Sequence, residues 1–552
     1  MPNSSQRQTM ANAIRALAMD AVQAANSGHP GMPMGMADAA TALFCDHLKF
    51  DATSPDWPDR DRFVLSAGHG SMLIYALLHL TGYEDMTIEQ IRNFRQLGAR
   101  TAGHPEFGHA KGIETTTGPL GQGIANAVGM AMAERHMAAR YGDDLVDHHT
   151  YVIAGDGCLM EGVSHEAASM AGHIKLGRLI VLFDDNNISI DGSTDLSTSD
   201  DTSGRFEAYG WQVLSCDGHD MDAVSAAISA AQADDRPSLI CCKTIIGLGA
   251  PNKQGTSGVH GAPLGDAEIA LARETLGWPH PAFEIPTDIL AEWRAVGAQG
   301  AAAHQSWQDR HAASKNQTAF DAAIANDFDK DVAAAVLAWK NQLASAPQKL
   351  ATRVASQKAI EAILPACPTL LGGSADLTGS NNTRVADHTI FDHGNYSGTY
   401  IHYGVREHGM AAAMNGIALH GGATPYGGTF MVFTDYCRPS IRLSALMEQR
   451  VIYVMTHDSI GLGEDGPTHQ PVEHLAALRV MPNLFVFRPG DAVETAEAWQ
   501  TALEAKSTPS ILALSRQGLA QVRHGDMAET KNARGADVAV DCEGARQITV
   551  LE

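Results

Sequence analysis

Two short apolar runs on either side of a helix-sized segment constrain the fold of this chain more than any other feature. Residues 151–154 and residues 179–183 are apolar and β-rich, and each run stops at a cluster of Gly, Asp or Asn. Runs of this kind predict buried strands, and the segment between them is long enough for a crossover helix. The C-terminal ends of parallel strands lie at one edge of the sheet, where open α/β sheets bind ligands. We therefore predict that Asp156 and Asn186, which follow the two strands, lie side by side.

The residues at these strand ends predict a cation site beside an anion site. A carboxylate and an amide oxygen with nearby carbonyls suit a hard cation such as Mg²⁺ or Ca²⁺, which keeps room for water and substrate phosphates. Gly155 and Gly157 flank Asp156 and allow backbone N–H groups to approach a diphosphate closely. The alternative is a pair of ordinary tight turns, so the interpretation depends on the rest of the chain.

Composition argues against several classes of protein. At 552 residues the chain is too long for one core, and its length predicts about three or four domains. A formal net charge of −24 argues against wholesale binding of nucleic acids or anionic membranes. No apolar run approaches the ~18 residues of a membrane span, and no secretory signal is visible. The eight cysteines are scattered without a Cys-x-x-Cys pair, which predicts reduced thiols in a cytoplasmic protein.

Histidines recur where predicted elements end. His29, His69 and His104 each lie close to Gly or Pro at such a point, and His260 lies in a polar loop. One histidine of this kind is more often structural, but the repetition indicates the rim of a pocket. Residues 118–123 form a Gly-rich entrance to a helix, whose first N–H groups are free to face a ligand.

The alternation of strands and helices predicts two parallel-sheet α/β domains in series. Besides the two central strands, the first domain is expected to have strands at residues 62–66, 211–215 and 237–246. The strands expected in the second domain are residues 369–371, 399–403, 451–456, 484–487 and 510–514. We assign the chain to a first domain (1–320), a helical linker (321–350), a second domain (351–530) and the start of a third (531–552).

Six polar motifs, taken together, identify a family. They are Ser-Gly-His-Pro-Gly (27–31), Gly-His-Gly-Ser (68–71), Gly-Pro-Leu-Gly-Gln-Gly (118–123), Gly-Asp-Gly-Cys-Leu-Met-Glu-Gly (155–162), Arg-Glu-His-Gly-Met (406–410) and Gly-Glu-Asp-Gly-Pro-Thr-His-Gln (463–470). In this order they resemble the transketolase family over about residues 1–530. The resemblance implies two thiamine diphosphate-binding domains, the first for the diphosphate and the second for the aminopyrimidine ring. It also implies a homodimer in which each cofactor lies between two subunits.

The resemblance implies a reaction as well. Members of the family transfer a two-carbon ketol group reversibly from a ketose phosphate, such as xylulose 5-phosphate, to an aldose phosphate, such as ribose 5-phosphate, in the pentose phosphate pathway. Glu407 resembles the carboxyl that hydrogen-bonds the pyrimidine ring. Asp156, Asn186 and the carbonyl of Ile188 resemble the ligands of Mg²⁺, for which Ca²⁺ or Mn²⁺ can substitute.

The remaining roles are implied residue by residue. The histidines implied to move protons and hold substrate hydroxyls are His29, His69, His104, His260 and His469. Cofactor contacts are implied for Gly157, Leu120, Phe430, Phe433 and Tyr436, and cofactor or subunit contacts for Glu161 and Asp376. Asp465 resembles the group that reads a donor hydroxyl, and the residues that resemble the grip on the sugar phosphate are Arg353, Ser380, His457 and Arg516.

The chain departs from the family pattern at its C-terminus. Family members have three domains in series, and this chain supplies two and the start of a third. We expect cofactor binding to survive, and leave dimer stability and full activity open. The alternatives are a dihydroxyacetone synthase, a deoxyxylulose phosphate synthase and a cofactor-binding paralogue without activity. The histidines, His104 among them, and the phosphate-gripping residues favour transketolase over deoxyxylulose phosphate synthase.

Overall fold

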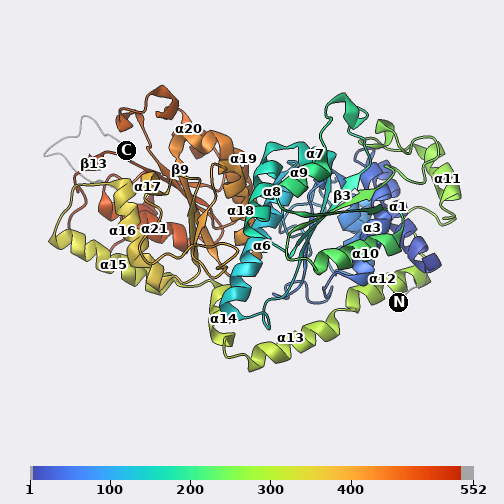
Figure 1. Cartoon of the computed structure of the whole chain (residues 1–552), viewed down its shortest axis with the longest axis horizontal. Helices are drawn as coiled ribbons and strands as arrows, with labels where there is room; N and C mark the ends of the chain where they lie inside the picture. Colours follow the sequence, from blue (N-terminus) through green and yellow to red (C-terminus); the bar gives the residue numbers. More distant parts are fainter. Residues whose placement is uncertain (1–3, 536–552) are drawn as a thin grey trace. The chain divides into compact units, whose positions relative to one another are not determined.

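Two parallel β-sheets organise the chain (Figure 1). The computed structural model describes residues 4–535. The chain divides into a first unit, Met1–Glu134 with Tyr141–Gln317, and a second unit, Arg135–Arg140 with Thr318–Glu552. The predicted start of a third domain at residues 531–552 lies largely outside the described residues. Within the described part, no helix is long and apolar enough to cross a membrane.

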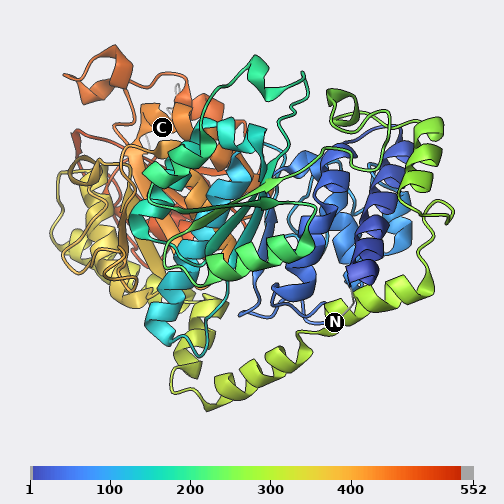
Figure 2. The same ribbon diagram turned by 45° about the vertical axis from the view of Figure 1, so that its right-hand side comes forward.

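The sheet of the first unit has five parallel strands in the order β1-β2-β3-β5-β4. They are β1 (Arg62–Leu65), β2 (Thr150–Gly155), β3 (Leu179–Asp185), β4 (Gln212–Asp217) and β5 (Ser238–Lys243). The side chains of the central strands β2 and β3 are almost all buried, as expected for a parallel sheet covered on both faces. Figure 2 shows helices against both faces. The predicted α/β class and the predicted strands of this unit are confirmed.

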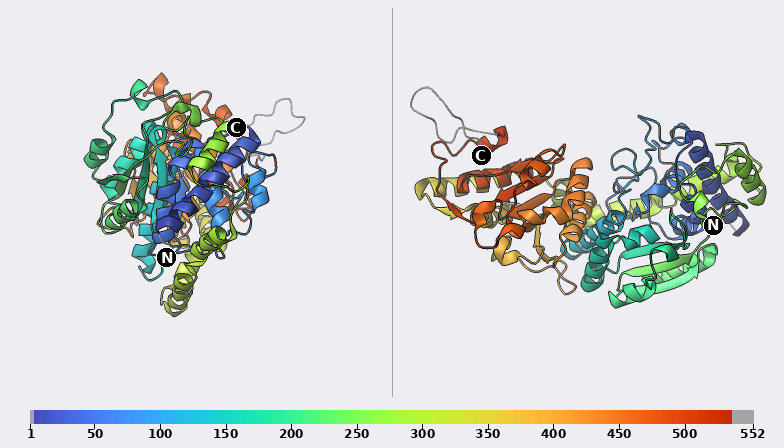
Figure 3. Two further views of the ribbon diagram at one scale, coloured as in Figure 1. Left: turned by 90° about the vertical axis from the view of Figure 1, so that its right-hand side faces the viewer. Right: turned by 90° about the horizontal axis from the view of Figure 1, so that it is seen from above.

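Helices of the first unit connect these strands and pack around them. They are α1 (Ser4–Ala25), α2 (Gly31–Gly35), α3 (Ala37–Asp46), α4 (Met72–Thr81), α5 (Ile88–Arg92), α6 (Gln122–Tyr141), α7 (Asp156–Met160), α8 (Gly162–Ile174), α9 (Thr202–Ala208), α10 (Met221–Gln232), α11 (Asp266–Thr275), α12 (Thr287–Ala298) and α13 (Ala301–Ala313). Helix α13 buries Trp307 and exposes most of its other side chains, so it runs along the surface of the unit (Figure 3).

The sheet of the second unit has six parallel strands in the order β11-β12-β10-β9-β7-β8. They are β7 (Leu370–Ser374), β8 (Tyr400–His402), β9 (Thr424–Phe430), β10 (Ile452–Thr456), β11 (Phe485–Phe487) and β12 (Ser510–Leu514), and a small separate pair joins β6 (Leu350–Ala351) to β13 (Gly518–Leu519). The helices are α14 (Gln317–Ala325), α15 (Asp329–Ser345), α16 (Thr352–Ile363), α17 (Thr378–Asn381), α18 (Glu407–His420), α19 (Thr434–Leu446), α20 (His474–Arg479) and α21 (Ala492–Glu504).

Strand β9 is the one strand of this sheet that the sequence did not predict. Its sequence, Thr-Pro-Tyr-Gly-Gly-Thr-Phe, contains Pro and Gly, which argue against a central strand. The tertiary structure needs the glycines, because a Cβ at Gly427 would come within 2.7 Å of the Met414 sulfur on α18. A helix packed this closely against the strand compensates for its weak β-propensity.

Residues predicted to form a helical linker contribute to the core of the second unit. Val332 and Val336 of α15 pack in one apolar cluster with Tyr426 of β9 and Trp499 of α21. The same two helices share a buried ion pair, in which Lys340 Nζ lies 2.7 Å from Glu497 Oε1. Both side chains are at most 2% exposed. Helix α15 is therefore held by the core and by a charge pair shielded from water.

The Lys340–Glu497 pair generates a stability prediction. We expect Lys340→Met to destabilise the second unit by about 3–5 kcal/mol, because it leaves the Glu497 carboxylate buried without its main counter-charge. Urea unfolding followed by circular dichroism measures the loss. Lys330→Met, an exposed change on the same helix, is the control and should change little. The double variant with Glu497→Leu should recover much of the loss; a single variant as stable as the parent chain would contradict the prediction.

Candidate active site

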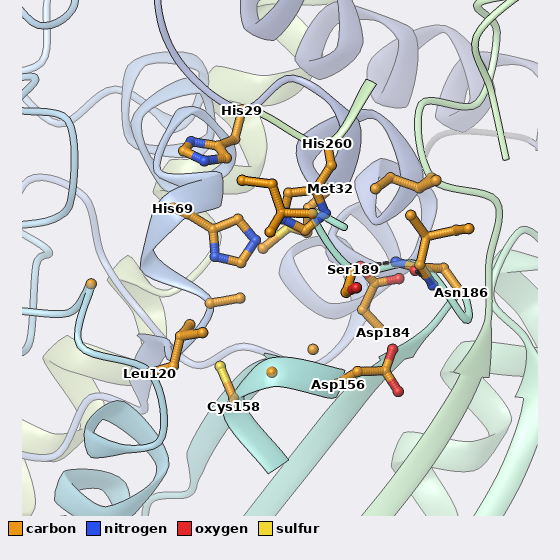
Figure 4. A pocket seen from close by; sticks show the side chains of 17 residues that line it. His29, Met32, His69, Leu120, Asp156, Cys158, Asp184, Asn186, Ser189 and His260 are labelled. Carbon is orange, nitrogen blue, oxygen red and sulfur yellow. Dashed lines mark hydrogen bonds between the residues drawn. The ribbon is translucent and has the colours of Figure 1, made fainter. Parts of the chain in front are cut away.

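A cavity of about 270 Å³ opens at the C-terminal edge of the first sheet (Figure 4). Its walls come from the segments that follow four strands, with His69 after β1, Asp156 after β2, Asn186 after β3 and Ile246 after β5. The remaining lining residues are His29, Met32, Ala67, Gly118, Leu120, Gly155, Gly157, Cys158, Asp184, Ile188, Ser189, Ile190 and His260. The parallel sheet thus collects residues that are far apart in the sequence.

Asp156 and Asn186 lie in this cavity together, as expected from their positions after two neighbouring strands. Asn186 is held by its neighbours, because its Nδ2 donates to Asp184 Oδ2 at 2.9 Å and its Oδ1 accepts from the Ile188 N–H at 2.9 Å. A Cβ at Gly157 would come within 2.9 Å of Leu120 Cδ1, so Gly157 and Leu120 lie against each other in the cavity wall. The geometry therefore brings the predicted metal ligands and two of the predicted cofactor contacts, Gly157 and Leu120, into one cavity.

The carboxylates in and beside this cavity lie close enough to repel one another. Burial, followed by the negative charges of the nearby Asp184 and Asp185, raises the pKa of Asp156 to about 7. Burial also raises the pKa of Asp184 to about 6. Lys243 is ion-paired with Asp185. A bound divalent cation would remove this repulsion, and the oxygen-rich donor set fits a hard ion.

Three histidine rings form a cluster on another wall of the cavity. The ring centroids of His29 and His69 are 5.2 Å apart, those of His69 and His260 are 5.1 Å apart, and those of His29 and His260 are 5.9 Å apart. Burial, followed by the charges of the other histidines, lowers the pKa of His69 to about 3 and that of His29 to about 4. The pKa of His260 is lowered by burial alone. These imidazoles are therefore neutral near pH 7, and the buried Nδ1 atoms of His29 and His260 have no hydrogen-bond partner within residues 4–535.

His104 and Glu161 lie next to the cavity rather than in its wall. A Cβ at Gly118, which lines the cavity, would come within 3.0 Å of His104 Cγ. The His104 carbonyl accepts a hydrogen bond from the Tyr75 hydroxyl at 3.1 Å, and burial lowers the pKa of its ring. Glu161 is exposed, and its Cβ approaches the Gly121 position at the entrance to α6.

A second group of predicted residues gathers at the C-terminal edge of the second sheet. Glu407 begins α18 and is 8% exposed. Its Oε1 accepts a hydrogen bond from Thr429 Oγ1 at 3.1 Å, so that β9 fixes the carboxyl. A buried carboxyl held in this way is suited to a hydrogen bond with a ligand, because its position is set before the ligand arrives.

The predicted aromatic residues follow directly after Thr429. Phe430 stacks on Phe433 with ring centroids 5.9 Å apart, and Phe433 lies 5.8 Å from Tyr436. His457 lies 3.9 Å from Phe430, and His469 lies 5.3 Å from Phe433. Tyr436 is 63% exposed, so this aromatic group reaches from the buried end of β9 to the surface of the unit.

Two arginines converge near His457. Arg353 Nη1 donates to the Ser380 carbonyl, whereas Arg516 donates to the Leu462 carbonyl at 3.4 Å and pairs with Glu464. Burial lowers the pKa of Arg353, and the charge of Arg516 lowers it further. Burial lowers the pKa of His457 to about 4, with Arg353 as the next contributor, while Asp465 opposes the shift. The buried Nε of Arg353 has no partner among the described residues. The cluster therefore offers positive charge and an unused N–H donor to an anion.

The two remaining predicted residues, Asp376 and Asp465, are exposed side chains of the second unit. Asp376 lies just after β7 and has a positive φ of 59°. The charge of Asp465 acts on His457, so Asp465 belongs to the second group.

Several cavity residues were not singled out by the sequence analysis. Asp184 lies near the end of β3, and Ser189 and Ile246 follow β3 and β5, so the rule that located Asp156 and Asn186 applies to them too. Cys158 lies within a motif that the sequence analysis recognised. Met32 carries no comparable signal, because an apolar side chain on a short helix is ordinarily part of a core.

Comparison with known families agrees with this geometry. Residues 6–333 match the family described as the thiamine diphosphate binding domain of transketolase, and residues 348–521 match its pyrimidine binding domain. An α/β unit that matches the first, followed by one that matches the second, defines a thiamine diphosphate-binding enzyme. The chain belongs to the transketolase family.

Individual relatives cover nearly all of the chain. The transketolase of Cereibacter sphaeroides is 64% identical over 548 residues, which are 99% of this chain and 83% of the relative. That of Rhodobacter capsulatus is 59% identical over 544 residues, or 98% of this chain and 81% of the relative. Among solved structures, transketolase from Leishmania mexicana has a TM-score of 0.89 and 46% identity, covering 93% of this chain and 77% of that one. Pichia stipitis transketolase in complex with sedoheptulose-7-phosphate has a TM-score of 0.90 and 44% identity, covering 96% and 80%.

The histidine cluster generates a pH prediction. Because the folded pKa of His69 is far below its ordinary value, the unfolded chain binds the proton first. Stability is therefore fully present above about pH 6.5 and is lost as the pH falls toward about 3. When the pH is lowered from about 7 to about 5, the unfolding free energy of the parent chain should fall. The unfolding free energy of His69→Asn, which lacks this titrating group, should fall by up to about 2 kcal/mol less.

Urea unfolding at the two pH values measures this difference. His173→Asn, which changes an exposed histidine of α8, is the control and should follow the parent chain. An identical pH dependence for His69→Asn and the parent chain would show that His69 is not held neutral by the fold.

Proposed function

We propose that this chain catalyses the transketolase reaction, the reversible transfer of a two-carbon ketol group from a ketose phosphate, such as xylulose 5-phosphate, to an aldose phosphate, such as ribose 5-phosphate. The observation that carries the proposal is that one chain contains both kinds of site. Its first unit has an oxygen-rich cavity lined by neutral histidines, and its second unit has a buried glutamate and an arginine cluster. Family membership and the sugar-phosphate complex of the Pichia stipitis relative support it. The proposed context is the pentose phosphate pathway, and the cytoplasm remains the predicted location.

The first-unit cavity is proposed to hold the diphosphate and a metal ion. Asp156, Asn186 and the carbonyl of Ile188 would coordinate Mg²⁺, with Ca²⁺ or Mn²⁺ able to replace it. The raised pKa of Asp156 supports this assignment, because a cation next to the carboxyl would restore its ionised form. Gly157 and Leu120 would contact the cofactor, and Glu161 would contact the cofactor or the partner subunit.

Glu407 is proposed to bind the pyrimidine ring of the cofactor. When bound, thiamine diphosphate supplies a carbon nucleophile and an electron sink for cleavage of a C–C bond. The contribution of the chain is to hold the carboxyl of Glu407 through Thr429, so that the carboxyl would be placed to hydrogen-bond a ring nitrogen of the bound cofactor. Phe430, Phe433 and Tyr436 would enclose the ring. Asp376 would contact the cofactor or the partner subunit.

Neutral histidines are proposed to move protons to and from substrate hydroxyls. His29 and His260 each have a buried Nδ1 without a partner among the described residues, so each nitrogen can accept or donate a proton when a substrate arrives. His69 completes the cluster in the cavity wall, and His104 lies behind Gly118. His469, beside Phe433 in the second unit, is proposed to act in the same way.

The arginine cluster is proposed to hold the substrate phosphate. Arg353 and Arg516 supply charge and several N–H donors, which suit phosphate oxygens. A phosphate would relieve the repulsion that lowers the pKa of Arg353. His457 and Ser380 would add hydrogen bonds, and Asp465 would read a hydroxyl of the donor sugar.

We also propose a homodimer with the cofactor sites at the subunit interface. Large apolar side chains are exposed around the Glu407 and His469 segments, namely Val405, Tyr436, Ile460 and Val472, which are between 63% and 77% exposed. Exposed apolar side chains gathered beside functional loops are typical of a surface that a partner covers.

The test of the proposed function is a coupled assay with xylulose 5-phosphate and ribose 5-phosphate. Thiamine diphosphate and Mg²⁺ are each present or omitted. Turnover that requires both supports the proposal. Cofactor binding without turnover would favour a different donor, as in dihydroxyacetone synthase or deoxyxylulose phosphate synthase, or a paralogue without activity. Failure to bind the cofactor would overturn the proposal.

The metal-site assignment predicts the effect of removing one carboxylate. Asp156→Asn should weaken Mg²⁺-dependent binding of thiamine diphosphate by about 10–100-fold or more, because a charged metal ligand is lost. Isothermal titration calorimetry with and without Mg²⁺ measures the change. Asp191→Asn, an exposed change in the loop after β3, is the matched control. Parent-like affinity in Asp156→Asn would refute the metal site.

The assignment of Glu407 predicts a separation between binding and turnover. Glu407→Gln should lower kcat by about 10²–10⁴-fold, the usual contribution of a positioned acid or base. Affinity for thiamine diphosphate should change far less, because the diphosphate contacts remain. Glu448→Gln, which alters an exposed turn residue of the same unit, serves as the control. Turnover of Glu407→Gln within twofold of the parent rate, a limit set roughly by assay error, would contradict the role.

A further inference from the structure

Two cysteines face each other across the edge of the first sheet. Cys216 of β4 and Cys242 of β5 are direct partners in the parallel pairing of these strands. Their sulfur atoms are 4.0 Å apart, and both are free thiols. Paired strands lie about 4.8 Å apart, which is within the Cα separation of about 4.4–6.8 Å that disulfides require. A rotation of the side chains is therefore enough to join the two sulfur atoms.

The two thiols differ in the way that a reactive pair requires. Cys216 is half-buried and can be reached from solvent, whereas Cys242 is fully buried. The hydrogen bond with Cys242 lowers the pKa of Cys216, and the same contact, followed by burial, raises the pKa of Cys242 well above its ordinary value. Because the thiolate is the nucleophile, Cys216 reacts with an oxidant first and Cys242 is the resolving thiol.

Neighbouring cysteines do not share this arrangement. Cys241 precedes Cys242, so its side chain points to the opposite face of the sheet. Its partner across the strand pair is Ser215, and its sulfur lies 3.6 Å from the Ser203 hydroxyl. Cys158 lies in the wall of the cavity. Cys216 and Cys242 are thus opposite each other in the strand register, and their side chains lie on the same face of the sheet.

We propose that Cys216 and Cys242 form a peroxide-sensitive modification site, which closes into a reversible disulfide between β4 and β5. The Cys216 thiolate attacks one oxygen of hydrogen peroxide, the O–O bond breaks, and hydroxide leaves with a proton as water, so that Cys216 becomes a sulfenic acid. The Cys242 sulfur then attacks the Cys216 sulfur and displaces a second water. In total, two thiols are oxidised by two electrons and one peroxide is reduced to two waters. A dithiol reductant reverses the reaction.

We expect the disulfide to affect the cavity, because the segment that follows β5 forms part of the cavity wall. Thr244 donates to the Asp184 side chain, and Ile246 lines the cavity. The segment after β4 is attached to the same stretch, since the Ile245 N–H donates to His219 Nε2 at 2.9 Å. A disulfide at Cys242 would lie two residues before Thr244 and would tie the strand that leads into the cavity wall covalently to β4. We therefore expect the oxidised chain to bind thiamine diphosphate more weakly; this consequence alone rests on the proposed function.

Peptide mapping of the full chain tests the modification site. The reduced protein is treated with hydrogen peroxide, alkylated and digested with trypsin. Because Pro237 follows Arg236, residues 206–243 remain one peptide that contains Cys216, Cys241 and Cys242. We expect this peptide to lose two hydrogens and two alkylation sites, and to regain them after dithiothreitol. A second cleavage before the aspartates between the cysteines should leave two fragments joined by the disulfide.

Matched variants identify the partners and the outcome that would overturn the proposal. Cys241→Ser should still form the disulfide, whereas Cys216→Ser and Cys242→Ser should not. Full alkylation of both cysteines after peroxide, or a disulfide that survives in Cys242→Ser, would overturn the site.

Calorimetric titration with thiamine diphosphate and Mg²⁺ then tests the link to the cavity. Oxidation should weaken binding by roughly tenfold in the parent chain, within the range of ordinary coupling between sites, and dithiothreitol should restore it. Peroxide-treated Cys216→Ser should keep its affinity, which controls for oxidation of Cys158. If the disulfide forms and affinity is unchanged, the modification site stands and its coupling to the cavity is refuted. If the reduced chain binds no cofactor, the proposed function fails while the mapping result is unaffected.

Discussion

The parallel pairing of neighbouring strands is the constraint on which both functional groups of this chain depend. In the first sheet, Gly155 at the end of β2 is in register with Asp184 of β3, so the next residues of both strands emerge at the same edge. In the second sheet, Thr456 of β10 is in register with Phe430 of β9, which brings His457 against the Phe430 ring. The backbone hydrogen bonds that hold the sheets together therefore also set the positions of the reactive side chains.

The two groups have opposite electrostatic character, which follows from what surrounds each of them. The cavity of the first unit gathers buried carboxylates, and burial and mutual repulsion raise the pKa of Asp156. The cluster of the second unit gathers arginines, and burial, followed by the positive charge of the neighbouring arginines, lowers the pKa values of Arg353 and His457. One group is suited to a cation and the other to an anion. The clustered histidines His29, His69 and His260 carry no charge near neutral pH, so they can exchange protons without disturbing either balance.

Much of the fold could be predicted because most strands have a clear local sequence pattern. The strands of the first sheet, and five of the six in the second, are predicted by runs of apolar residues bounded by polar clusters. Strand β9 could not be predicted in this way, because Gly427 and Gly428 weaken the local signal. The close neighbours that explain these glycines, the methionines of α18 at Gly427 and Thr383 at Gly428, are known only from the folded chain. The role of α15 was also hidden, since nothing local shows that Lys340 would be buried against Glu497.

The sequence by itself determined the α/β class, the order of the strands along the chain, and the residue types that carry the chemistry. It did so because the length of an apolar run and the residues at its end reflect local backbone preferences. It could place Asp156 beside Asn186, since one crossover between parallel strands fixes that neighbourhood. Only the tertiary structure decided that three histidines from separate loops contact one another, that Glu407 is held by Thr429, and that Cys216 faces Cys242. These contacts depend on strand order, burial and packing, which are properties of the folded chain as a whole.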